Sequence, residues 1–252
     1  MSELRRTIYD RFYGPRTRAS VVANTFNYAV GRGLDVRQII CQTGLTPADF
    51  IDPKTRLPEE TVPTIWNLLD NVYPGQALAL HMAGAAPFSF FGPLAQGVQY
   101  ASDLRSALQL LVQYGTLLSD QVHVELIESQ SEAIFRSDHP VDVIDGGYGA
   151  EAALALINRL LQEAIGKEYS LARVEFAHRP LGLHRLYEDF FEAPVRFQQA
   201  HNVLVFPQEA LLLPTRQWDA DLFYHVQETL DSSHHGYAWV SGLKGLRNKG
   251  QP

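Results

Sequence analysis

Apolar side chains recur at helical spacing through the first half of the chain. The most regular stretch follows Ser102, which stands at an N-cap position with Asp103 in the first turn. The apolar positions fall at i, i+3, i+4, i+7 and i+8, and are Leu104, Ala107, Leu108, Leu111 and Val112. This spacing predicts an amphipathic helix that ends near Gly115.

Further helices are predicted before this one, over residues 19–34, 36–43, 61–73 and 76–85. Gly31 and Gly33 end the first of them, as C-terminal glycines commonly do. The residues predicted to face inward are Ile39 and Ile40 in the second helix, and Val62, Ile65, Trp66 and Leu69 in the third.

The first two helices and their short connection leave two interpretations open. A helix-turn-helix that reads DNA is one, and plain helical packing is the other. The second helix offers only Arg37 and Gln38 in place of the basic face that a DNA reader uses. Plain packing is therefore the preferred interpretation.

From residue 121 the hydrophobic period changes to two. Alternating runs over 122–127 and 133–136 predict a β-hairpin. A long helix over 153–165, a strand over 171–177, a short helix over 181–191 and strands over 195–199 and 203–206 follow. The sequence therefore predicts an α+β fold, with a helical lobe over 19–120 and a mainly antiparallel sheet with packed helices, in the order ββαβαββ, over 121–214.

The two ends of the chain differ from this regular part. Residues 1–18 are rich in arginine, and we expect a flexible arm that is either solvated or in contact with phosphate. Residues 215–231 are predicted to form a linker helix with one buried face, made by Trp218, Leu222, Phe223, Val226 and Leu230. Residues 232–252 lack a sustained period and are expected to be disordered.

Composition and charge narrow the class of protein. The 252 residues are 46% hydrophobic and carry a net charge of −7, which argues against a whole-surface attraction to nucleic acid. Cys41 is the single cysteine, so no intramolecular disulfide can form and a reducing cytoplasm is expected. The chain shows neither a signal peptide nor an apolar stretch of membrane-spanning length, so no membrane partner is expected.

Common catalytic and metal-binding motifs are absent from the sequence. It contains no G-x-S-x-G elbow and no H-E-x-x-H pair, and Cys41 is expected to be a buried structural thiol. Isolated histidines near element ends are more often surface or hydrogen-bonded residues than catalysts; here they are His178, His184 and His201. We therefore predict no catalytic residue, no metal site, no DNA-binding residue and no cofactor.

Three glycines, at 146, 147 and 149, precede the long helix. A helix N-terminus can hold an anion, but these glycines lack the spacing of a dinucleotide-binding loop and the Lys-Ser/Thr of a P-loop. An aromatic cluster of Phe88, Phe90 and Phe91 is the remaining feature, with Trp66, Tyr100 and Tyr114 on neighbouring segments. Such aromatics either line a small-molecule pocket or form ordinary core.

Three stretches resemble one family in their order and spacing. They are TGLTPADFIDPKTRLPEETVPTIWNLL over 43–69, FFGPLAQGVQYASDLRSALQLLVQYGTLLSD over 90–120 and RPLGLHRLYEDFFEAPVRFQQAHNVLVFPQEALLLP over 179–214. The segment from about residue 17 to 225 resembles the N-terminal regulatory domain of one branch of AraC-type transcriptional regulators. In that branch an arabinose-binding-like α+β domain replaces the cupin barrel.

The resemblance implies a domain that senses a small effector or mediates dimerisation. In the family a separate C-terminal domain with two helix-turn-helix motifs binds DNA. Residues 219–230 are similar to the first helix of that domain, but the following tail does not supply recognition helices. The chain is then expected to be a fragment or a natural truncation, unable to bind DNA by itself, and to pair with a second copy or a full-length relative.

For an apolar effector, the resemblance makes Phe88, Phe90, Phe91 and Tyr114 the candidate lining residues. Arg173 is the candidate partner of an effector carboxylate, because an arginine fork pairs well with one, although a strand position can equally face solvent. Two alternatives stay open. One is a pure interaction module that acts as a decoy, and the other is a small-molecule enzyme of α+β fold.

Overall fold

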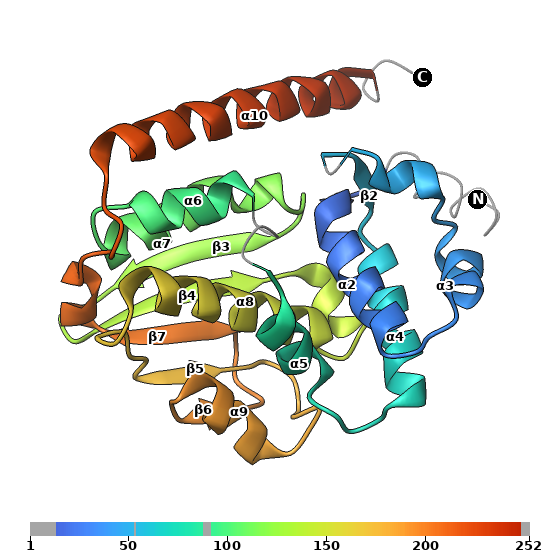
Figure 1. The fold of residues 1–252 in the computed structure, drawn as a ribbon, viewed down its shortest axis with the longest axis horizontal. Coiled ribbons are helices and arrows are strands. Elements are labelled where there is room, and N and C mark those ends of the chain that lie inside the picture. Colours follow the sequence, from blue (N-terminus) through green and yellow to red (C-terminus); the bar gives the residue numbers. More distant parts are fainter. Residues whose placement is uncertain (1–13, 53, 88–91, 248–252) are drawn as a thin grey trace.

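The helical lobe and the sheet lie beside each other in the computed structural model, which describes residues 14–52, 54–87 and 92–247 (Figure 1). The helical lobe begins with α2 (Ala19–Gly31), α3 (Val36–Thr43) and α4 (Thr61–Val72), with α4 packed against both of the others. A short 3-10 turn, η1 (Pro47–Phe50), connects α3 toward α4.

Both ends of α3 are capped by the residues that the sequence indicated. The Asp35 carboxylate accepts a hydrogen bond from the Arg37 N–H at 2.8 Å, and Gly44 ends the helix in the left-handed conformation at φ 68°. Only Ile39 of this helix is buried. The predicted inward position of Ile40 and the predicted burial of Cys41 are wrong, because one and two residues further along a helix the side chain has turned away from the core.

The predicted flexible arm over residues 1–18 is wrong for residues 16–18, which form a strand. Strand β1 (Arg16–Arg18) pairs antiparallel with β2 (Arg56–Pro58), and the Thr17 side chain between the two arginines is buried. These strands are too short to show an alternating pattern in the sequence. Residues 1–13 lie outside the described part of the chain.

Three helices complete the first half of the chain: α5 (Leu78–Ala85), α6 (Pro93–Tyr100) and α7 (Leu104–Tyr114), followed by the turn η3 (Gly115–Leu117). The strongest sequence signal, that of α7, is confirmed. Its N-cap is Asp103, whose carboxylate accepts from the Ser106 N–H at 2.8 Å, and the Ser102 hydroxyl hydrogen-bonds to that carboxylate. The cap is thus one residue later than predicted.

The second half of the chain confirms the α+β prediction and its ββαβαββ order. A five-stranded sheet has the order β3-β4-β7-β5-β6, and only the β5–β6 pair is parallel. The strands are β3 (His123–Glu128), β4 (Glu132–Asp138), β5 (Arg173–Glu175), β6 (Val195–Arg196) and β7 (Val203–Pro207). The connecting segments include η4 (Pro140–Val143), α9 (His184–Phe191) and η5 (Gln208–Leu212).

Helix α8 (Tyr148–Ile165) is the central element of the core. It packs against α4, α5, α6 and α7 of the helical lobe and against β4 and β7 of the sheet. Because it has neighbours on both sides, 13 of its 18 residues are buried. This explains why its apolar pattern is the cleanest of the long helices in the chain.

Buried polar groups surround the N-terminal part of α8. The Asp145 carboxylate accepts from the Gly147 and Gly149 N–H groups at 2.9 and 3.0 Å, so the chain itself occupies the anion position at this helix end. Gly147 has φ 113°, and a Cβ there would lie 2.2 Å from His178 Cγ, so both backbone and space require glycine. Glu151 is completely buried and accepts from the Tyr187 hydroxyl at 2.6 Å.

The last helix, α10 (Ala220–Arg247), lies across α6, at the top of the view in Figure 1. The helix begins at Ala220 and not directly after Pro214, so Trp218 precedes it. Val226 and Leu230 are buried as predicted and Phe223 is partly buried, whereas Trp218 and Leu222 are exposed. The chain is helical through residue 247, where disorder was expected. The hydroxyls of Thr229, Ser232 and Ser233 bond back to carbonyls one turn earlier, which keeps polar side chains compatible with a helix.

Among the described residues, each helix is too short or too polar to cross a lipid bilayer.

We predict that Glu151→Gln makes unfolding stability less dependent on pH. Burial raises the pKa of Glu151 to about 8, so the folded state holds a proton that the unfolded chain releases near its ordinary value. The contribution of Glu151 to the free energy of unfolding is therefore fully present below pH 4.5. It falls as pH rises toward 8, by at most about 1.4 kcal/mol per pH unit. Urea titrations from pH 4.5 to 8.5 measure the slope, with the exposed Glu163→Gln as control. Equal slopes in wild type and Glu151→Gln would contradict the prediction.

We predict that Tyr114→Phe loosens α10. The buried Tyr114 hydroxyl donates to Asp231 of α10 at 2.6 Å, and a hydrogen bond to a partly exposed carboxylate contributes about 1–2 kcal/mol. Amide hydrogen exchange around Asp231 should become roughly five- to thirtyfold faster, while exchange in α8 stays unchanged. The control is Tyr100→Phe, since the Tyr100 hydroxyl makes no hydrogen bond to a described residue.

Candidate functional site

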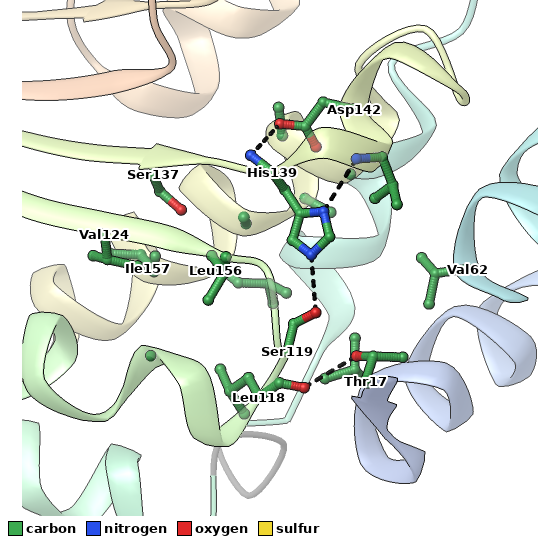
Figure 2. A pocket seen from close by; sticks show the side chains of 18 of the residues that line it. Thr17, Val62, Leu118, Ser119, Val124, Ser137, His139, Asp142, Leu156 and Ile157 are labelled. Carbon is green, nitrogen blue, oxygen red and sulfur yellow. Dashed lines mark hydrogen bonds between the residues drawn. The ribbon is translucent and has the colours of Figure 1, made fainter. Parts of the chain in front are cut away.

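A cavity of about 180 Å³ lies between the helical lobe and the sheet (Figure 2). Its walls come from α2, α4 and α7 on one side and from β3, β4 and α8 on the other. Most of the lining is apolar and includes Val21, Val62, Trp66, Met82, Leu94, Leu111, Leu118, Val122, Val124, Phe135, Leu156 and Ile157. Pockets for small molecules commonly have this composition.

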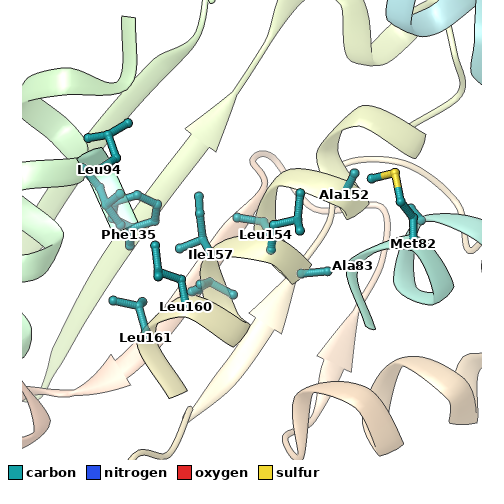
Figure 3. Close-up of a cluster of buried hydrophobic side chains, with 14 of the residues drawn as sticks. Met82, Ala83, Leu94, Phe135, Ala152, Leu154, Ile157, Leu160 and Leu161 are labelled. Atoms are coloured by element: carbon teal, nitrogen blue, oxygen red, sulfur yellow. The ribbon is translucent and has the colours of Figure 1, made fainter. Parts of the chain in front are cut away.

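The cavity borders the main core. Leu94, Phe135 and Ile157 belong both to its lining and to the buried cluster around α8 (Figure 3). Met82 from α5 and Ala152 from α8 do the same. Any molecule bound here would therefore contact the side chains that hold the two lobes together.

A small set of polar side chains interrupts this apolar lining. The set consists of Thr17, Asn24, Thr25, Glu59, Ser119, Ser137, His139 and Asp142. They come from segments far apart in the sequence, and Figure 2 shows Ser119 and His139 meeting across the cavity wall. A few polar groups in an apolar pocket fix the orientation of a ligand.

One hydrogen-bonded chain connects three of these groups, and its direction is defined. His139 Nδ1 accepts from the Val141 N–H at 3.1 Å, so the proton of the neutral ring lies on Nε2. His139 Nε2 then donates to Ser119 Oγ at 2.9 Å, and the Ser119 hydroxyl donates to Glu59 Oε1 at 2.5 Å. The Gln121 N–H also donates to Glu59 Oε1, at 3.2 Å.

The electrostatics follow from these contacts. His139 Nε2 also lies 3.4 Å from Glu59 Oε1. Burial by itself raises the pKa of Glu59, but the contacts with His139 and Ser119 outweigh it, and the pKa lies below its usual value. Glu59 is therefore a buried carboxylate at neutral pH, with 3% of its surface exposed. Burial and the neighbouring charge of Asp145 raise the pKa of Asp142 to about 7.

Two buried polar atoms of the lining lack partners. Glu59 Oε2 and Trp66 Nε1 make no hydrogen bond to a described residue. The Ser137 hydroxyl and the Asn24 amide, which also line the cavity, make none within the described part of the chain. Buried polar groups are rarely left in this condition, so an unmatched set around a cavity is a sign of a binding site.

The contact among Ser119, His139 and Glu59 resembles a hydrolytic triad in residue types but differs in its connections. In a working triad the histidine accepts the serine proton and is itself oriented by the acid. Here serine stands in the middle, its proton goes to Glu59, and Val141 occupies the other nitrogen of His139. The order of these contacts therefore differs from that of a Ser-His-acid triad.

No group of three or more His, Cys, Asp or Glu side chains in the described segments is arranged to hold a metal ion.

The residues predicted from sequence as a ligand site lie elsewhere or outside the described residues. Phe88, Phe90 and Phe91 lie outside the described residues. Tyr114 is buried but directs its hydroxyl to Asp231, and Arg173 pairs with Glu132 and Glu175 on the sheet at 2.6 and 2.7 Å. Neither of these two lines the cavity.

Sequence reasoning missed the residues that do converge there, chiefly Glu59, Ser119, Ser137 and His139. Glu59 and Ser119 are 60 positions apart, and a hydrogen bond across that distance leaves no periodic signal. His139 offered a weak local signal, since it follows an alternating run and precedes a proline. Trp66 was correctly predicted to face inward and has no exposed surface.

Comparisons with known proteins agree with this architecture. The family described as "Arabinose-binding domain of AraC transcription regulator, N-term" matches residues 33–215. The crystal structure of the transcriptional regulator CdpR from Pseudomonas aeruginosa is similar with a TM-score of 0.55 at 18% sequence identity, a likeness of fold alone. The similar region covers 74% of this chain and 58% of that one, so this chain spans a little over half of that regulator.

Comparison with curated protein sequences gave no match. The family match nevertheless extends from the second helix of the helical lobe to the end of the sheet, and includes most of the cavity lining. The protein therefore belongs to the family of N-terminal arabinose-binding domains of AraC-type transcription regulators.

Proposed function

We propose that this chain senses a small, largely apolar effector that binds in the cavity between the helical lobe and the sheet. The supporting observation is the cavity itself, whose apolar walls and unmatched polar groups come from both lobes. A pure interaction module would instead present an exposed apolar face without such a space. The dimerisation expected from the family resemblance stays a prediction.

The size of the cavity limits the effector. An engineered apolar cavity of about 150 Å³ binds benzene, whereas pockets for drug-sized molecules are about 300–1,000 Å³. At about 180 Å³, this cavity suits a single ring or a short branched chain with one polar substituent.

The position of the cavity gives an effector a route to the last helix. Leu111 and Gly115 line it at the end of α7, and Tyr114 between them holds Asp231 of α10. An occupant that shifts this turn would change the Tyr114–Asp231 contact. We propose α10 as the element through which occupancy is transmitted.

We predict that an effector raises the melting temperature of the wild-type chain and that Ala153→Leu abolishes this rise. Ala153 lines the cavity from α8, so leucine there fills part of the space. A ligand at about a hundredfold its Kd adds about 2.7 kcal/mol, which corresponds to about 5–10 °C for a chain of this size. The measurement is a thermal-shift screen against a library of small metabolites.

The matched control for this screen is Ala23→Leu, at an equally half-buried helical alanine that does not line the cavity. Both variants are first compared without ligand, since overpacking can itself lower stability by about 1–3 kcal/mol. Compounds that stabilise wild type and Ala153→Leu equally would bind elsewhere and would contradict the proposal.

The close contact of Ser119 and His139 makes a hydrolase the second candidate, and we predict that it fails. Because the Ser119 proton is donated to Glu59 and not to His139, the hydroxyl is not activated. Wild type and Ser119→Ala should hydrolyse p-nitrophenyl acetate equally slowly, as followed by absorbance. A loss of about a hundredfold or more in Ser119→Ala would instead indicate catalysis.

A further inference from the structure

The charged groups around the cavity are of one sign. Its ionisable lining residues, within the described chain, are Glu59, Asp142 and the neutral ring of His139. The described lining holds neither lysine nor arginine. An anionic ligand would therefore be placed beside a buried carboxylate, with no lysine or arginine of the described lining to balance the two negative charges, which is strongly unfavourable.

Glu59 has an incomplete set of hydrogen bonds and pairs with neither lysine nor arginine in the described residues. Its histidine neighbour, His139, has Nε2 3.4 Å from Glu59 Oε1, but this ring accepts the Val141 N–H at Nδ1 and is neutral in that arrangement. Oε1 accepts from Ser119 and Gln121, but Oε2 has no partner in the described residues. A buried carboxylate is retained in proteins when it is paired or ligated, and it loses several kcal/mol of solvation when it is not. The missing partner is thus a hydrogen-bond donor, and preferably one with positive charge.

Other polar groups of the lining can accept the remaining hydrogen bonds of such a donor. An ammonium group has three N–H donors and accepts nothing. Besides Glu59, the cavity presents the Ser137 hydroxyl oxygen and the Asn24 amide oxygen as acceptors without partners among the described residues. Most of the rest of the wall is apolar and suits a hydrocarbon body, and the Trp66 side chain is part of it.

We infer that the effector is a small apolar amine whose ammonium group pairs with Glu59. This inference rests on the proposed function, since it names the chemical class of the molecule that the cavity takes. Glu59 acts as the specificity-determining residue, because its charge favours an amine over a neutral molecule of the same shape and rejects a carboxylate.

Four probes with the same ring test this inference on wild type: benzylamine, benzyl alcohol, toluene and benzoate. Thermal shift and isothermal titration calorimetry should rank benzylamine tightest, because its charge-assisted hydrogen bond contributes more than the neutral one of benzyl alcohol. Benzoate should bind at least about tenfold more weakly, because its carboxylate is repelled by Glu59. Tightest binding of benzyl alcohol, toluene or benzoate would overturn the inference, as would no binding by benzylamine. The wild-type ranking needs no variant to fold.

The variant Glu59→Gln should lower benzylamine affinity roughly tenfold or more and leave toluene affinity unchanged, because glutamine keeps the shape and removes the charge. Its control is Glu60→Gln at the neighbouring exposed position. Circular dichroism first confirms that each variant is folded. Equal benzylamine affinity in a folded Glu59→Gln protein would overturn the role of Glu59.

The two proposals fail in different ways. If benzoate or toluene binds tightest and Ala153→Leu abolishes that binding, the cavity is the effector site and only the amine inference is wrong. If the benzylamine shift survives Ala153→Leu but is lost with Ala23→Leu, or survives both, then the cavity is not the site. That result would contradict the proposed function and the inference together.

Discussion

The burial of α8 between two layers is the constraint on which the rest of the structure depends. A helix covered by the helical lobe on one side and by β4 and β7 on the other cannot satisfy polar groups with water. Its polar partners must therefore be internal. Asp145 caps its first turn. The Tyr187 hydroxyl donates to Glu151, and the Tyr169 hydroxyl donates to Asn158 at 2.7 Å. The cavity lies along the same helix, where the two layers do not fully meet.

Patterns confined to one element were readable in the sequence. The stripe of α7 and the long helix α8 follow from periodicity, and so does the alternation of β3 and β4. The order of elements then gave the α+β fold, because short connections leave few ways to pack them. The short strand β1, which pairs with β2, carries no such pattern and was not predicted. Strand β6 was predicted over 195–199 and spans only Val195–Arg196, beside β5.

The candidate site could not be predicted because its residues meet only through space. Ser119 stands between His139 and Glu59 in a chain of contacts whose members lie on three separate segments. The sequence contains these residue types, but it does not show which of them donates each hydrogen bond. The direction of these hydrogen bonds depends on the backbone N–H of Val141, which donates to His139 Nδ1. The sequence analysis selected aromatic residues as the candidate pocket lining, but the Tyr114 hydroxyl is hydrogen-bonded to Asp231 of α10.

The exposed thiol of Cys41 has a practical consequence. It is the single cysteine of the chain and lies on α3, which packs against the cavity-lining helix α4. A maleimide dye or a nitroxide can therefore be attached at one defined point of the helical lobe without altering any residue. The emission of that dye, or the mobility of that nitroxide, would report whether the surroundings of α3 change when the cavity fills.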